Sequence, residues 1–207
     1  MFILSKKRLL ILVIIIILLI VGTIGIYYGR AVKIKMFGTR VKPSEVYKPR
    51  EVKFFLQNNP QWRSDRLGDS KFTLGSSGCL VSVLATALND LGYQTNPQDL
   101  NHLFTNHGAY TRGGAVIWYK INEIIPGIKY SYQRFFNGKT LEQELAQGRL
   151  PIVKVKYHKT GIFHWVLIVG ANEEEFLIID PLVQDEEIIE LKTHGRVYAY
   201  RVLSKTN

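Results

Sequence analysis

Residues 75–91 read GSSGCLVSVLATALNDL, and this stretch decides the fold. After Cys79, apolar side chains recur every three or four residues, which is the spacing of one buried helical face. Ser77 can cap the start of such a helix, and Gly92 can end it. The sequence therefore predicts a helix over residues 79–91 with a thiol in its first turn.

The thiol in this helix belongs to the single cysteine of the 207-residue chain. One cysteine excludes an intrachain disulfide and a thiolate-rich zinc or iron–sulfur site, and we expect neither metal nor cofactor. The positive end of a helix dipole favours the thiolate form of Cys79, and Gly78 leaves room for a substrate carbonyl to approach the sulfur. Cys79 is therefore a candidate nucleophile. The alternative is a buried structural cysteine, because a free thiol packs like a small apolar side chain.

Two residues further along the chain could act with this thiol. His164 lies near the start of the predicted strand 162–169, and a strand would hold its imidazole in the fixed pose that a base needs. Asp180 ends the predicted strand 176–179, and antiparallel pairing of the two strands would bring its carboxylate within reach of His164. Taken singly, His164 can be a structural histidine and Asp180 the start of an Asp-Pro turn.

A fourth candidate, Gln57, lies 22 residues before Cys79 in the segment KFFLQNNPQW. Its amide could donate a hydrogen bond to a developing oxyanion, together with the backbone N–H of Cys79. The alternative is a solvated polar loop residue. The four other histidines are weaker candidates for a base, because they fall in a helix-like segment, in turns, or just past a strand: His102, His107, His158 and His194.

From residue 51 onward the pattern predicts an α+β domain, in which helices come first and an antiparallel run of strands follows. A second helix opens at Asn96-Pro97, and two more are expected over residues 115–125 and 140–147, the last begun by Thr140. The expected strands are residues 152–157, 162–169, 176–179, 188–191 and 197–202.

The N-terminal part predicts one transmembrane helix. Residues 9–28 contain no Asp, Glu, Lys or Arg and, at 1.5 Å per residue, would span about 30 Å, the thickness of a hydrocarbon core. Three basic residues precede this run, and Tyr27 and Tyr28 close it, as in an interfacial aromatic belt. We expect residues 1–28 to be a membrane anchor. A cleaved signal peptide and a buried core helix are the alternatives.

Basic residues cluster next to this run. Residues 1–50 carry 10 Lys and Arg and one acid, Glu45, whereas the rest carries 17 basic and 16 acidic residues. The near-neutral domain gives no reason to expect a nucleic-acid partner. Residues 29–50 hold Pro43 and Pro49 and are predicted to be a basic tether. Their charge favours the cytoplasmic side, whereas the short basic start favours an anchor with its domain outside. We expect a single-pass protein of the cell membrane with an extracytoplasmic domain.

The segments QNNPQW, TLGSSGCLVSVLATAL, GIFHWVLIVG and FLIIDP together resemble the papain-like domains of cysteine peptidase family 39, the bacteriocin-processing type, in its stand-alone branch. The resemblance covers about residues 52–183. It implies a papain-like fold for residues 51–207, with Cys79 as nucleophile, His164 as base, Asp180 orienting His164, and Gln57 in the oxyanion hole. The transporter-fused members have Asp before the cysteine, where this chain has Gly78, so we do not predict their double-glycine leader substrate.

The predicted function is thiol-dependent hydrolysis of peptide or amide bonds at a membrane surface, through an acyl-enzyme on Cys79, in a bacterial protein. The substrate would be a peptide or a peptidoglycan-like molecule. Three alternatives share the fold: a cell-wall amidase or endopeptidase, an amide-forming acyltransferase, and a non-catalytic peptide-binding module. They differ in whether the thiol is activated and in whether water or an amine resolves the acyl-enzyme.

Overall fold

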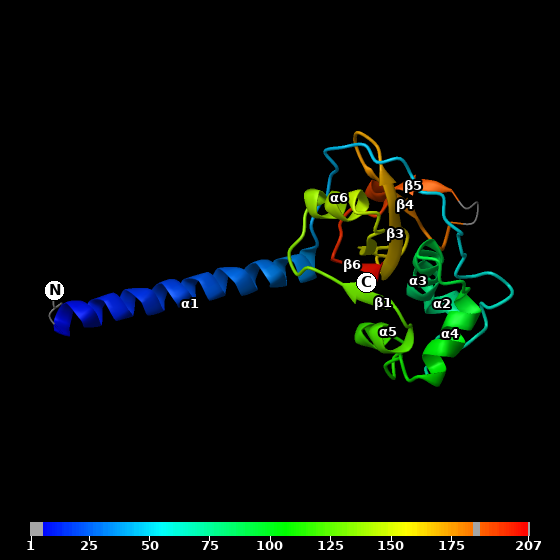
Figure 1. The fold of residues 1–207 in the computed structure, drawn as a ribbon, viewed down its shortest axis with the longest axis horizontal. Helices are drawn as coiled ribbons and strands as arrows, with labels where there is room; N and C mark the ends of the chain where they lie inside the picture. Colours follow the sequence, from blue (N-terminus) through cyan, green and yellow to red (C-terminus); the bar gives the residue numbers. More distant parts are fainter. Residues whose placement is uncertain (1–5, 184–186, 207) are drawn as a thin grey trace.

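A six-stranded sheet with the strand order β1-β6-β2-β3-β4-β5 lies at the centre of the computed structural model, which describes residues 6–183 and 187–206 (Figure 1). Every described strand pairing is antiparallel, which confirms the α+β class. The strands are β1 Ile128–Ser131, β2 Ile152–Lys156, β3 Phe163–Ala171, β4 Phe176–Ile179, β5 Ile188–Glu190 and β6 Ala199–Lys205.

Three of the strands differ from the predicted set by more than one residue. The edge strand β1 was not predicted, since its four residues IKYS are too few to show a strand period, and it forms by pairing with β6. The last strand, β6, starts two residues later than predicted and continues to Lys205, because pairing with β1 extends it. Strand β3 runs on to Ala171, opposite Phe176 at the start of β4.

The helices are α1 Lys6–Phe37, α2 Leu74–Ser77, α3 Cys79–Asp90, α4 Pro97–Asn106, α5 Trp118–Ile124 and α6 Gly138–Ala146, with the 3-10 turn η1 Leu191–Thr193. The caps predicted for two of them are wrong. Ser77 ends α2 instead of capping α3, whose N-cap is Gly78. Asn137, not Thr140, caps α6, and Thr140 supplies the third helical residue of that capping box. The helix predicted over residues 115–125 starts only at Trp118.

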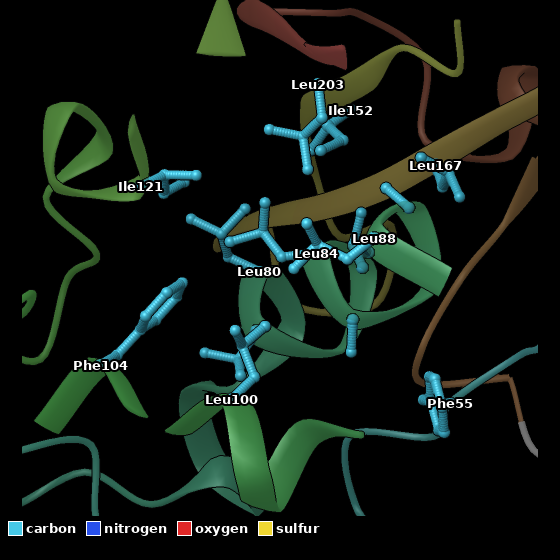
Figure 2. Close-up of a cluster of buried hydrophobic side chains, with 14 of the residues drawn as sticks. Phe55, Leu80, Leu84, Leu88, Leu100, Phe104, Ile121, Ile152, Leu167 and Leu203 are labelled. Carbon is cyan, nitrogen blue, oxygen red and sulfur yellow. The ribbon is translucent and has the colours of Figure 1, made fainter. Parts of the chain in front are cut away.

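Helix α3 is buried along its length, where the sequence predicts one buried face. All residues from Leu80 to Leu88 are buried, including Ser82 and Thr86. Figure 2 shows the reason: Leu80, Leu84 and Leu88 follow α3 between β3 and helix α4 with its Leu100 and Phe104. Small side chains on α3 allow this close packing on more than one side.

Two apolar cores lie on the two faces of the sheet. The larger core joins the face that carries Ile152, Leu167 and Leu203 to helices α3, α4 and α5. The smaller core joins the opposite face, through Val166 and Ile168, to α6 and to Val41. The predicted arrangement of N-terminal helices on a C-terminal antiparallel sheet is confirmed for α3, α4 and α5, whereas α6 covers the other face.

Residues 38–50 do not behave as the predicted tether, because they are attached to the domain. Thr39 pairs with Val197, and Tyr47 pairs with Ala171. The buried carboxylate of Glu142 on α6 accepts hydrogen bonds from the backbone N–H groups of Ser44 and Glu45. Basic composition and two prolines suggested a linker, but backbone pairing with residues far along the chain determines the structure here.

Helix α1 extends away from the rest of the molecule, with the N-terminus at its far end (Figure 1). Its segment Leu10–Phe37 is long and apolar enough to cross a membrane, and its most apolar window has no buried residue. A segment of this kind near an N-terminus is a membrane span or a signal sequence. The helix continues nine residues beyond the predicted anchor, and Tyr27 and Ile34 contact the domain. Residues 1–5 and 207, at the ends of the predicted anchor and domain, lie outside the described residues.

Candidate active site

The candidate site begins at the junction between α2 and α3, where Cys79 is the first helical residue and is partly exposed. The junction is tight: a Cβ atom on Gly78 would lie 2.4 Å from the backbone oxygen of Leu74. Packing inside the protein therefore requires a glycine at position 78. The sequence had suggested another reason for this glycine, namely room for a substrate carbonyl to approach the sulfur. The tight turn fixes the thiol at the start of a buried helix, where the helix dipole favours a negative charge.

His164 is brought to this site by β3, whose second residue it is. Its ring is buried, and its Nε2 atom lies 2.6 Å from Oδ1 of Asp180. An ionised carboxylate can only accept, so Nε2 donates and the other ring nitrogen, Nδ1, is left for Cys79. The structure thus places the two residues together, as strand pairing predicted. Leu167 faces Ile179, the last residue of β4, and Asp180, the next residue along, reaches back to His164.

The electrostatics of the site favour a charged His164. Burial lowers the pKa of His164, but hydrogen bonds with Asp180 and Cys79 raise it more, to about 9. Burial also opposes ionisation of Asp180, yet hydrogen bonds from His164 and His194 hold the pKa of this carboxyl far below its usual range. An imidazolium beside a thiol is the arrangement in which the thiol can ionise as a paired thiolate.

His194 is a residue of this site that the sequence did not reveal. Its side chain is buried, and its Nε2 atom lies 3.0 Å from Oδ2 of Asp180. The backbone N–H of Leu182 donates to Oδ1 of the same carboxylate over 2.8 Å. Three donors therefore surround Asp180. His194 follows η1, which packs against β4, and nothing in its glycine-bordered sequence context predicts that approach.

Aromatic rings cover the two histidines of the site. The ring of Tyr157 lies 5.4 Å from that of His164 and 5.8 Å from that of His194, measured between centroids. The ring of His158 lies 5.3 Å from that of His194. These rings limit the access of water to the hydrogen bonds of Asp180, which strengthens the bonds. Within the described residues, no three His, Cys, Asp or Glu side chains are grouped as metal ligands would be.

Gln57 is buried and lies between two parts of the site, whereas the sequence placed it in a polar loop. Its backbone N–H donates to the carbonyl of Pro181, directly after Asp180. Its side-chain Nε2 donates to the carbonyl of Gly75, in the turn that precedes Cys79, over 2.8 Å. An amide nitrogen has two hydrogens, so one donor remains beside the α2–α3 junction. Its Oε1 atom is buried and has no hydrogen-bond partner among the residues that the structure describes.

Comparison with known proteins adds a structural similarity to this geometry. No family model and no curated protein matches the chain. A crystal structure described as a "putative C39-like peptidase from Bacillus anthracis" is similar to 76% of this chain and 100% of that chain, with 15% sequence identity and a TM-score of 0.49. The interpretation of the site therefore depends on its own geometry.

The pKa shifts predict how stability depends on pH. His164 has a raised pKa, so its contribution is complete below about pH 6.5 and is lost as the pH rises through about 9. Asp180 has a lowered pKa, so its contribution is present above its ordinary value of 3.8 and is lost only as the pH falls well below that. We expect thermal melting in detergent to show a plateau from about pH 4 to 6.5 and a decline toward pH 9. Asp180→Asn should reduce that decline, because Asp180 is the first of the groups that raise the pKa of His164, while Asp65→Asn, beside the exposed His102, should retain it. An unchanged decline in Asp180→Asn would contradict the assignment.

The hydrogen bond from His194 to Asp180 predicts an effect on the stability of the protein at low pH. His194→Leu leaves Oδ2 of Asp180 without a donor, so the pKa of Asp180 should rise and acid unfolding should begin at a higher pH. His194→Gln keeps an amide donor and should restore part of the wild-type behaviour. Melting temperatures from pH 2 to 6 would measure this, with the exposed His107→Leu as control. Equal acid midpoints in His194→Leu and wild type would show that the bond does not hold the Asp180 charge.

Proposed function

We propose that this protein is a papain-like cysteine peptidase that hydrolyses peptide or amide bonds through an acyl-enzyme on Cys79, at a membrane surface. One observation carries the proposal: the buried carboxylate of Asp180 accepts a hydrogen bond from Nε2 of His164 over 2.6 Å, and Cys79 is among the groups that raise the pKa of this imidazole. A nucleophile, a base and a group that orients the base make up the constellation of covalent acyl transfer. The resemblance of residues 52–183 to peptidase family 39 agrees with it.

In the first half of the reaction the Cys79 thiolate attacks the carbonyl carbon of the scissile bond and forms a carbon–sulfur bond. Negative charge then develops on the carbonyl oxygen. The remaining N–H of the Gln57 amide and the backbone N–H of Cys79 are the donors that we assign to it. Nδ1 of the His164 imidazolium gives its proton to the leaving nitrogen as the carbon–nitrogen bond breaks. The product amine leaves, and a thioester on Cys79 remains.

In the second half neutral His164 takes a proton from water, and the oxygen attacks the thioester carbonyl. The carbon–sulfur bond breaks, the carboxylic acid product leaves, and the thiolate and the imidazolium are restored. Asp180 keeps the imidazole in one orientation and stabilises its charge in both halves. His194 acts as a positioning residue, because it contacts Asp180 and we assign it no contact with the reacting atoms.

The catalytic proposal predicts an activated thiol and a cleavage activity that share the same residues. Because Cys79 is the only cysteine, iodoacetamide alkylation reports on it alone. Wild type should alkylate at pH 6 faster than free cysteine by about tenfold or more, and His164→Ala should lose this advantage. Cleavage of a mixed peptide and peptidoglycan library should disappear in Cys79→Ala and His164→Ala and persist in the exposed-residue control His102→Ala.

Two results would overturn parts of this proposal. Alkylation of wild type at the rate of free cysteine would leave a non-catalytic peptide-binding module as the better interpretation. An activated thiol that forms a thioester but releases it only to added amines would instead indicate an acyltransferase.

The membrane part of the proposal concerns α1. We propose that the helix anchors the protein in the cell membrane, because the apolar surface of the helix is uncovered. We propose that the enzyme domain lies outside, because the short basic start of the chain favours that orientation. Deletion of residues 1–26, which keeps the contact between Tyr27 and Phe135, should yield a soluble protein. Protease added to intact cells should digest the domain of the full chain. Membrane pelleting of the truncated protein would contradict the anchor, and digestion only after lysis would reverse the orientation.

A further inference from the structure

A cavity of about 650 Å³ lies where the C-terminal turns of α1 meet the sheet. It lies apart from the hydrogen bonds of Asp180, because its described lining includes Lys154 and Trp165 but not His164, Asp180 or His194. Its walls include Tyr28, Val32 and Lys35 from α1, and Lys154, Trp165 and Arg201 from the sheet. The volume is sufficient for a small ligand or a lipid headgroup.

Three of these wall residues are cations, and Lys154 feels the charges of the other two. Burial lowers the pKa of Lys154, and the charges of Arg201 and Lys35 lower it further. Within the described residues, none of the ion pairs involves Lys35, Lys154 or Arg201. The Nε atom of Arg201 is also buried without a hydrogen-bond partner. Lys154 and Arg201 are partly buried, and Lys35 is exposed at the rim of the cavity. Partly buried like charges are unfavourable without a counter-charge, so the cavity is suited to an anion.

Aromatic rings hold these cations in place and supply apolar walls. The guanidinium carbon of Arg201 lies 4.4 Å from the ring centroid of Tyr132 and 5.5 Å from that of Trp118. The Lys154 Nζ atom lies 3.9 Å from the ring centroid of Phe163. Trp118 and Trp165 stand 5.4 Å apart on the same cavity. Cations next to Trp and Tyr are typical of the boundary between lipid and water.

The position of the cavity along α1 matches the headgroup layer of a membrane. The apolar run ends at Tyr28, and Lys35 follows seven residues later, about 10 Å along the helix. Each headgroup layer of a bilayer adds roughly 5 to 8 Å beyond the hydrocarbon core. The cavity residues of α1 therefore begin at the edge of the hydrocarbon and cross the depth at which lipid phosphates lie.

We propose that this cavity binds the phosphate-bearing headgroup of an anionic membrane lipid, with Lys35, Lys154 and Arg201 around the phosphate and the aromatic walls against the glycerol. The proposal rests on membrane attachment through α1 and not on the chemistry of Cys79. The Cys79 thiol is close enough to influence Lys154 electrostatically. A bound lipid would therefore hold the candidate nucleophile close to the membrane surface, where membrane-bound substrates are met.

The test uses the full chain in a mild detergent and native mass spectrometry. With equal amounts of phosphatidylglycerol and phosphatidylcholine, wild type should retain phosphatidylglycerol in preference. Lys154→Gln and Lys35→Gln should each weaken its binding about tenfold, as loss of one charged hydrogen bond does. Lys33→Gln is the matched control, because Lys33 is exposed on the same helix and does not line the cavity, and it should bind like wild type.

Equal retention of the two lipids, or an equal effect of Lys33→Gln, would overturn the proposal. Inorganic phosphate at millimolar concentration forms a separate arm: if it binds while phosphatidylglycerol does not, the ligand is a soluble anion and not a lipid. Membrane pelleting of the same variants from cells lysed without detergent separates failure of this site from failure of the anchor, since an anchored protein without lipid selectivity contradicts this proposal alone.

Discussion

The carboxylate of Asp180 has no exposed surface, and a buried charge of this kind is stable only when donors surround it. His164, His194 and the N–H of Leu182 supply those donors, and each comes from a different part of the chain. Strand β3 brings the first, the turn η1 brings the second, and the loop after β4 brings the third. The sheet order around β3 and β4 is therefore what allows the site to exist.

The same carboxylate connects the two halves of the candidate site. It raises the pKa of His164 and so favours the charged form of the ring. The Pro181 carbonyl next to it accepts the backbone N–H of Gln57, whose amide in turn reaches Gly75 before the nucleophile. A chain of hydrogen bonds thus runs from the sheet to the start of α3. Such a chain fixes distances that single contacts on flexible loops would leave variable.

Helix α1 gives the molecule a second organising constraint. The large apolar side chains over residues 10–26 are exposed, whereas the C-terminal part of the helix contacts the domain through Tyr27 and Ile34. Residues 38–50 are paired with distant strands, so the domain is attached closely to the helix and not through a long free linker. In a membrane this attachment would hold the cavity beside α1 near the lipid headgroups.

The sequence by itself determined the elements whose signals are local. The helix after Cys79, the helix opened by Asn96-Pro97 and the strand over residues 176–179 follow from apolar spacing, capping and short β-branched runs. The sequence also brought Cys79, His164 and Asp180 forward as candidates, because an isolated thiol at a helix start and polar residues at strand ends are visible in one dimension. Their catalytic roles and that of Gln57 stay predictions.

Only the tertiary structure decided which distant groups meet. His194 reaches Asp180 because η1 packs against β4, and residues 38–50 join the domain because Thr39 and Tyr47 find backbone partners more than 100 residues away. The uniform burial of α3 likewise depends on packing by the sheet and α4 together. These features rest on contacts between residues far apart in sequence, and local propensity and periodicity carry no information on such contacts.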